Sequence, residues 1–288
     1  MKRSCLVIIL LLILSVAYSQ NFSNKGKDFW LGYGYHINMG AGVPAGQVNA
    51  QDMVLYFTSD KNANITVNIP SNGYTATYSV AANQVTVSSP LPKTGSADAR
   101  VYDTGYFNRG IHITSDVDIV AYAHIYNQSV SGASLLFPTN TLGKDYYVVS
   151  YNQGSNSNYA NSFAFVVAVE TGTTQVEITP SVTNKNGKVA GTPFTINLTQ
   201  GQVYSLMGTT SGLVGTDLTG TRIRSLSSTG SCKKIAVFCG TGKISIGATT
   251  NSGSNNQTGT GDNLFAQAVP ATAWGLRYLT SPTTSQPS

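Results

Sequence analysis

Hydrophobic and polar residues alternate with a period of two along most of the chain, and no helical periodicity lasts beyond a few residues. Such alternation is typical of half-buried β-strands. The segments recur at intervals of roughly 8–12 residues and are separated by Gly, Pro, Asn and Ser, which favours β-sandwiches or barrels. The expected strands are 29–37, 53–58, 65–69, 74–80, 84–87, 111–114, 118–126, 146–151, 163–170, 175–179, 194–198, 202–206, 222–225, 234–239 and 243–246.

The chain also repeats itself. Gly-Lys-Asp-Phe-Trp at 26–30 returns as Gly-Lys-Asp-Tyr-Tyr at 143–147 and, in weaker form, as Gly-Leu-Arg-Tyr-Leu at 275–279. Repeats of this length predict modules large enough to hold a core. We expect an all-β protein of two tandem, similar antiparallel β-sandwich modules, at 20–142 and 143–274. Residues 275–288 start a third repeat or form a linker. A propeller-like fold or one merged barrel is the alternative.

Residues 1–19 have the pattern of a Sec-type signal peptide. Lys2 and Arg3 precede an apolar run, and Ala-Tyr-Ser at 17–19 offers a small-x-small cleavage site. The run is shorter than the roughly 20 apolar residues of a membrane span, and we expect no membrane span in the mature chain. The sequence therefore predicts a secreted or cell-surface protein that begins at Gln20.

Charge is scarce. Loss of Lys2 and Arg3 lowers the formal net charge from +5 to +3, and only 10% of the residues are charged, well below the roughly 25% of ordinary globular domains. This weak bias gives no basis for binding nucleic acid or an anionic membrane.

Cys232 and Cys239 remain after export, within a segment that resembles one strand. Seven residues of extended chain span roughly 23 Å, whereas a disulfide needs Cα atoms within about 7 Å. We expect no bond between them. Two buried thiols, or a bond to a cysteine outside this sequence, are the alternatives.

Residues for catalysis or metal binding are sparse. His36, His112 and His124 share no short motif, and the only glutamates are Glu170 and Glu177. Ser-Asp-Val-Asp at 115–118 supplies too few oxygen ligands for calcium and is interpreted as a turn between two strands. We expect no catalytic residue, metal or cofactor.

Aromatic residues are the positive signal. Tyrosines alternate within single strands, and another flanks a long polar loop at 152–162. Such patterns arise from core packing or from a platform on which sugars or a partner's side chains stack. The candidates for ligand binding are Tyr33, Tyr35, Tyr122, Tyr126 and Tyr151, whereas Trp30 and Trp274, at matching ends of the repeat, are expected to be structural and to fill the junction between modules.

Several motifs resemble one known extracellular family, the IgGFc-binding protein N-terminal domain family. Their order is Gly-Lys-Asp-Phe-Trp at 26–30, the segment 111–122, Leu-Phe-Pro-Thr at 136–139 with 142–147, Cys-Lys-Lys-Ile-Ala-Val-Phe at 232–238, and 262–275. The resemblance marks Pro138, Gly143 and Cys232 as structural. It implies a bacterial, Bacteroidetes-like secreted binding module without catalytic residues.

The leading hypothesis is a non-enzymatic extracellular binding or adhesion module of a larger exported protein, with an extracellular glycoprotein or glycan as its partner. The alternative is a carbohydrate-binding accessory module of a polysaccharide-processing protein. A hydrolase is the third choice, because the sequence displays no carboxylate pair. No residue identifies a ligand, and immunoglobulin binding does not follow from the resemblance.

Overall fold

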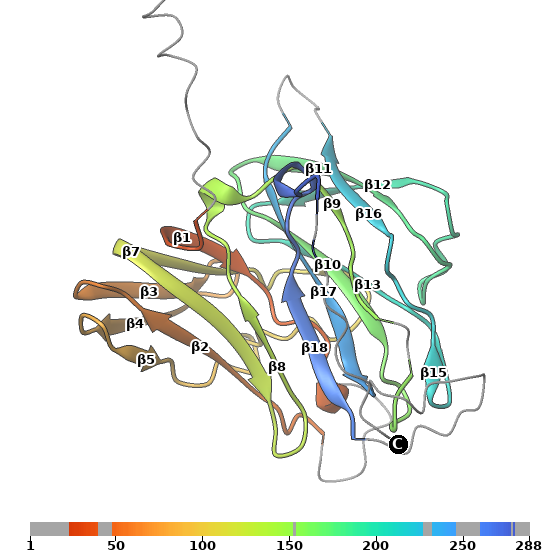
Figure 1. Cartoon of the computed structure of the whole chain (residues 1–288), viewed down its shortest axis with the longest axis horizontal. Helices are drawn as coiled ribbons and strands as arrows, with labels where there is room; N and C mark the ends of the chain where they lie inside the picture. Colours follow the sequence, from red (N-terminus) through yellow and green to blue (C-terminus); the bar gives the residue numbers. More distant parts are fainter. Residues whose placement is uncertain are drawn as a thin grey trace, which may run out of the picture.

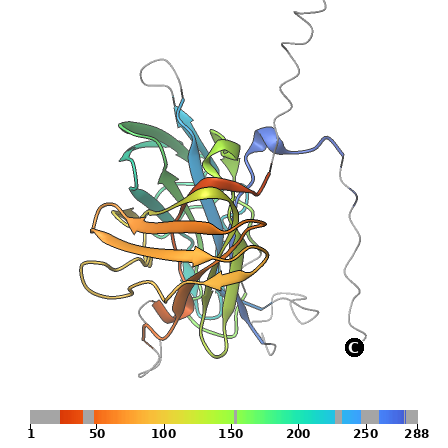
Figure 2. The same ribbon diagram turned by 90° about the vertical axis from the view of Figure 1, so that its left-hand side faces the viewer.

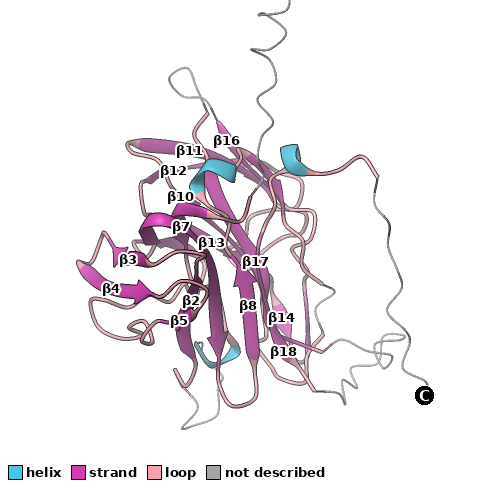
Figure 3. Cartoon of the chain, turned by 60° about the vertical axis from the view of Figure 1, so that its left-hand side comes forward, coloured by secondary structure: helices cyan, strands magenta, loops and turns pink. Residues whose placement is uncertain are grey.

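The computed structural model describes residues 23–39, 48–151, 154–226, 232–245, 260–277 and 279. Strands dominate the described residues, which contain only short 3₁₀ turns and no α-helix (Figure 3). The named strand pairs are all antiparallel. The predicted all-β class is therefore confirmed. The expected signal peptide lies outside the described residues.

The first repeat forms one seven-stranded sheet, which we call the first sheet. The beginning of its longest strand, β7, pairs with β1 and β3, and its end pairs with β2 and β8. Figure 2 looks onto this part of the molecule, with the orange strands in front. The strands are β1 (Gly26–Leu31), β2 (Asp52–Thr58), β3 (Ala63–Ile69), β4 (Tyr74–Val80), β5 (Val85–Val87), β7 (Ile111–Tyr126) and β8 (Ser131–Leu135).

The second repeat forms two sheets. The shared sheet has the order β18-β17-β10-β13-β6, and the outer sheet has the order β12-β11-β16-β9. A small hairpin, β14 (Thr210–Ser211) and β15 (Val214–Gly215), stands apart. The remaining bounds are β6 (Gly105–Phe107), β9 (Asp145–Tyr147), β10 (Ser162–Ala168), β11 (Thr173–Thr179), β12 (Phe194–Thr199), β13 (Val203–Met207), β16 (Arg222–Leu226), β17 (Ile235–Ile244) and β18 (Asp262–Gln267).

The two repeats have the same strand pairing. In the first, β1 and β3 flank the start of β7, β4 follows β3, and β2 lies between the end of β7 and β5. In the second, β9 and β11 flank β16, β12 follows β11, and β10 lies between β17 and β13. The last strand of each set also matches, since β8 pairs with the end of β7 and β18 pairs with β17. The single strand β7 thus takes the place of both β16 and β17.

The shared sheet is the middle of three layers (Figure 1). All residues of β10 are buried. Phe163, Phe165 and Val167 join the core of the first repeat, whereas Ala164 and Val166 pack in a separate core with the outer sheet. Because successive side chains of a strand point to opposite faces, burial on both sides requires the continuous apolar run of β10.

Residues of the first repeat reach directly into this layer. The strand β6 pairs with β13 and extends the shared sheet. The segment after β1 passes close to the sheet at Gly32, where an added Cβ would lie 2.9 Å from the ring of Phe165, and at Gly34, where it would overlap Phe163. Glycine is therefore required at both positions for the repeats to pack.

Two predicted turns are wrong. Residues 115–118 lie inside β7, because the strand continues from its pairing with β1 and β3 to its pairing with β2, with a register shift against β1 at this segment instead of a turn. Gly-Thr-Gly at 240–242, the predicted break between the strands at 234–239 and 243–246, lies inside β17, which merges the two.

The Gly-Lys-Asp motifs occupy matching positions in the repeats. Asp28 accepts hydrogen bonds from His112, at 2.8 Å, and from Thr139. Burial raises the pKa of Asp28, but these hydrogen bonds outweigh it and hold the pKa below its usual value. In the second repeat, Asp145 pairs with Arg222 at 2.6 Å. An acidic residue on the first strand thus pairs with a basic residue on its neighbour in each repeat.

The tryptophans differ in exposure. Trp30 is 2% exposed and stacks on His112, with 4.2 Å between ring centroids. Trp274 is 45% exposed, lies against Tyr147, and donates from Nε1 to the Val269 carbonyl at 3.2 Å.

Both described cysteines are free: Cys239 is buried in β17 and Cys232 is half-buried before it. Burial raises the pKa of Cys239 to about 11, so this thiol is protonated and unreactive at neutral pH. In the described part of the chain, no helix has the length and apolar character that a membrane crossing needs.

Candidate functional site

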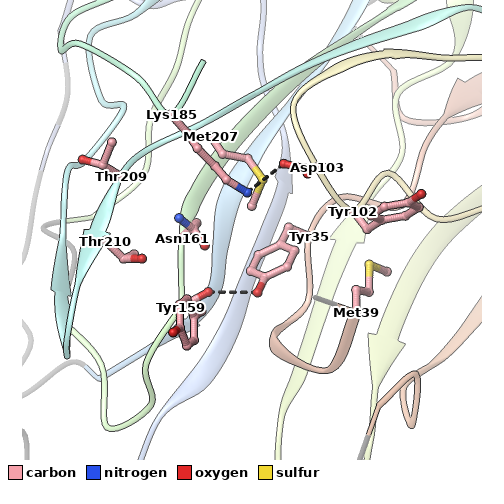
Figure 4. A pocket seen from close by; sticks show the side chains of 10 residues that line it. All are labelled: Tyr35, Met39, Tyr102, Asp103, Tyr159, Asn161, Lys185, Met207, Thr209 and Thr210. Atoms are coloured by element: carbon pink, nitrogen blue, oxygen red, sulfur yellow. Dashed lines mark hydrogen bonds and ion pairs between the residues drawn. The ribbon is translucent and has the colours of Figure 1, made fainter. Parts of the chain in front are cut away.

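A cleft of about 560 Å³ opens where loops of the two repeats meet (Figure 4). The first repeat contributes the segment after β1 and the loop before β6, and the second contributes the segments before β10, between β11 and β12, and after β13. Neither repeat forms the cleft alone. Its lining residues are Tyr35, Met39, Tyr102, Asp103, Tyr159, Asn161, Lys185, Met207, Thr209 and Thr210.

Tyr35 forms the floor. It is 3% exposed and packs so closely on β17 that a Cβ at Gly242 would lie 2.5 Å from its ring. Its hydroxyl donates to the Tyr159 carbonyl at 2.9 Å and joins the repeats (Figure 4). Burial raises the pKa of Tyr35, so the phenol remains a neutral donor.

Tyr159 forms the rim in an uncommon backbone conformation. Its φ is +62°, in the left-handed region that non-glycine residues seldom adopt. The side chain is 51% exposed, while the backbone is fixed by hydrogen bonds from Tyr35 and from the Asn161 amide, both 2.9 Å. Such strain costs of order 1–3 kcal/mol and is concentrated at functional sites.

An ion pair crosses the cleft from one repeat to the other. Lys185 Nζ lies 2.8 Å from Asp103 Oδ1, and the exposed fractions of the side chains are 44% and 48%. At this exposure the pair adds little stability. Its main effect is electrostatic, because one cation and one anion leave the cleft without net charge.

Tyr102 forms the opposite wall, supported by two arginines. The guanidinium carbons of Arg100 and Arg109 each lie 5.1 Å from the centroid of its ring. Both arginines pair with the buried Asp98, at 2.8 and 3.2 Å. The cation–π contacts, with both arginines fixed by their ion pairs to Asp98, therefore hold the ring in place while 37% of Tyr102 stays exposed.

The side chains that line the cleft are of kinds found at binding surfaces. It presents three tyrosines, two methionines and short polar side chains around a single ion pair. The two glutamates of the chain are engaged elsewhere: Glu177 with Arg224 at 2.7 Å, and Glu170 with the Lys234 amide at 2.8 Å. Among the described residues, no group of three or more His, Cys, Asp or Glu could hold a metal.

The tyrosines singled out from the sequence lie in different places. Tyr33 is fully buried and donates to the Val54 carbonyl. Of the five, only Tyr35 lines the cleft. Tyr122 and Tyr126 lie on the face of β7 that points away from the core. Tyr151 lies after β9 and is 41% exposed.

Sequence reasoning missed the other cleft residues. Tyr159 lies in the long polar loop at 152–162. An aromatic residue two positions before Asn161 in such a loop was the signal that could have pointed to it. Tyr102, Asp103 and Lys185 lie in loops without periodic pattern, and only the packing of the repeats brings them together.

Comparison with known proteins gives one match. A family model described as IgGFc binding protein matches residues 132–288, more than half of the chain. The match begins in β8 and includes the whole described second repeat. No curated protein matches the chain, and no solved structure does.

Proposed function

Because this chain belongs to the IgGFc binding protein family, we propose that it is a non-enzymatic binding module that acts outside the cell. In this proposal the module is part of a larger exported protein, on the surface or secreted, and it holds an extracellular glycoprotein in the cleft between its repeats. Adhesion then results from weak sites that gain avidity when modules are linked.

The observation that carries the proposal is the composition of the cleft. Tyrosine is enriched at protein-binding surfaces because it combines a large apolar ring with a polar tip and few rotatable bonds. Tyr102 and Tyr159 are both held in place and both exposed. Methionine adds a side chain that adapts to its partner.

The proposal is tested by surface plasmon resonance with the mature chain, residues 20–288, immobilised. The probes are the Fc fragment of immunoglobulin G, suggested by the family description, and a purified mucin. We expect saturable binding of at least one probe. Tyr102→Ala and Tyr159→Ala should each weaken it tenfold or more, as the truncation of a central tyrosine does at other interfaces.

Tyr106→Ala is the matched control, because Tyr106 is 57% exposed on β6 and lies outside the cleft. It should bind like the wild-type chain. Failure of both probes to bind, or binding that survives both cleft substitutions, would contradict the proposal.

A further inference from the structure

The first repeat carries a second aromatic surface, away from the cleft, which we call the tyrosine face. It consists of Tyr56 on β2 and Tyr122, His124 and Tyr126 on β7. These residues share one side of the sheet, since Tyr56 lies directly opposite Tyr122 and the β7 residues are two apart. The intervening Ala121, Ala123 and Ile125 point into the core.

Three of the four rings, those of Tyr56, His124 and Tyr126, are held by contacts with one another. His124 stacks on Tyr126 with 4.5 Å between ring centroids, and its Nδ1 lies 3.3 Å from the Tyr56 hydroxyl. Its Nε2 lies 2.8 Å from Ser131 Oγ on the neighbouring strand. A ligand would therefore find these three rings already ordered, and little of their conformational entropy would be lost on binding.

The equivalent surface of the second repeat shows what distinguishes this face. There the cross-strand pair is Phe165 and Phe238, on β10 and β17, and the rings stack 5.0 Å apart. That surface is fully buried against the first repeat. On β2 and β7, the strands with the same place in the first repeat, Tyr56 and Tyr122 form a cross-strand pair, and Tyr122 is 40% exposed.

This difference indicates the kind of partner. A surface that packs permanently against protein carries phenylalanine, whereas the tyrosine face keeps hydroxyl and imidazole groups beside its rings. Of the nearby carboxylates, Asp52, opposite Tyr126, pairs with Lys93 at 2.9 Å, and Asp262, which acts on His124, accepts a hydrogen bond from the Ser131 amide. Flat apolar rings bordered by neutral hydrogen-bonding groups match a sugar ring, which has an apolar face and a hydroxylated edge.

We propose that the tyrosine face binds neutral carbohydrate chains, with Tyr122 and Tyr126 stacking on the sugar rings. On one side of a strand, residues four apart lie roughly 13 Å from each other, so the two rings would contact different units of one chain. This surface is separate from the cleft, and the inference does not depend on the glycoprotein proposal.

The test is affinity electrophoresis of the mature chain in native gels that contain hydroxyethylcellulose, galactomannan, arabinoxylan or dextran. We expect at least one polysaccharide to retard the wild-type protein. Tyr122→Ala and Tyr126→Ala should each weaken the affinity tenfold or more. Tyr122→Phe, which keeps the ring, should change it less than threefold and shows that the fold is intact.

The cleft variant Tyr159→Ala serves as the second control and should be retarded like the wild-type chain. Migration unaffected by all four polysaccharides would overturn the inference, as would retardation that survives both alanine substitutions. Because these polysaccharides contain no protein, a failure to bind them would not affect the proposal that the cleft binds a glycoprotein. The carbohydrate inference would also be overturned if Tyr122→Ala lost binding to Fc or mucin while no polysaccharide bound the wild-type chain.

Discussion

Pro138, near the end of the first repeat, packs directly on Gly26 at its beginning, so closely that an added Cβ at Gly26 would overlap the proline ring. The second repeat has the same contact between Pro270 and Gly143. Each proline precedes a short 3₁₀ turn, at Thr139–Thr141 and Ala271–Ala273. The sequence motifs that mark the repeat are therefore the residues that join its two ends.

This contact predicts that Gly143→Ala destabilises the protein. The new methyl group has no space beside Pro270, and overpacking of this kind typically costs about 1–3 kcal/mol. Thermal unfolding should show a lower midpoint. Thr272→Ala, on the exposed side of the adjacent turn, is the control and should stay near the wild-type value. An unchanged midpoint in Gly143→Ala would show that the ends are not tightly joined.

The shared core predicts that the two repeats unfold together. Phe238 lies on the second repeat but is fully buried in the core of the first. Replacement of a buried phenylalanine by alanine costs about 3–5 kcal/mol. In calorimetry, Phe238→Ala should move one single transition to lower temperature. Two transitions, one of them at the wild-type temperature, would instead indicate independent modules.

The buried His36 predicts a loss of stability in weak acid. Burial lowers the pKa of His36 from 6.5 to about 4, against the opposing effect of its hydrogen bond to the Val130 carbonyl. Between these values the unfolded chain binds a proton that the folded chain does not. Stability therefore falls as the pH falls from 6.5 towards 4, by roughly 3 kcal/mol in all.

Urea unfolding between pH 7.5 and 4.5 measures this effect. Burial also lowers the pKa of His124, which adds in the same direction. The part of the change of unfolding free energy with pH that is due to His36 should be absent from His36→Gln, whatever the stability of that variant at pH 7.5. If His36→Gln keeps the full wild-type slope, the histidine is not the group responsible.

Tyr159 predicts opposite effects on stability and binding. Glycine adopts a positive φ without the steric cost that tyrosine incurs, so Tyr159→Gly should keep or raise the unfolding free energy by up to about 1 kcal/mol. The same substitution should weaken glycoprotein binding tenfold or more, as expected for Tyr159→Ala. Chemical denaturation and surface plasmon resonance on one sample distinguish the two effects. Lower stability together with full binding would show that the ring supports the fold and not the ligand.

Much of the fold was predictable because strand alternation is a local signal. The pattern of Ile65, Val67 and Ile69 gave β3 correctly, and the repeated motif predicted two sets of similarly paired strands. The strand β8 was missed, because its Ser-Gly-Ala-Ser-Leu segment carries little apolar pattern and is held by pairing with β7. The predicted module boundary at residues 142 and 143 falls between a 3₁₀ turn and β9.

The cleft could not be predicted in the same way. Asp103 and Lys185 are 82 residues apart, and their 2.8 Å contact depends on how the two repeats pack. That packing depends in turn on Gly32 and Gly34, whose missing side chains admit Phe165 and Phe163. Only the three-dimensional arrangement identifies such a requirement, since a glycine within a predicted strand is equally compatible with a bulge or a bend.

Hydrogen–deuterium exchange tests the central claim most directly. A protein of residues 20–288 is compared alone and with whichever glycoprotein probe binds it. The account predicts slower exchange at residues 102–103, 159–161, 185 and 207–210, which belong to both repeats and line the cleft. Protection confined to one repeat, or found only outside these segments, would contradict a binding site between the repeats.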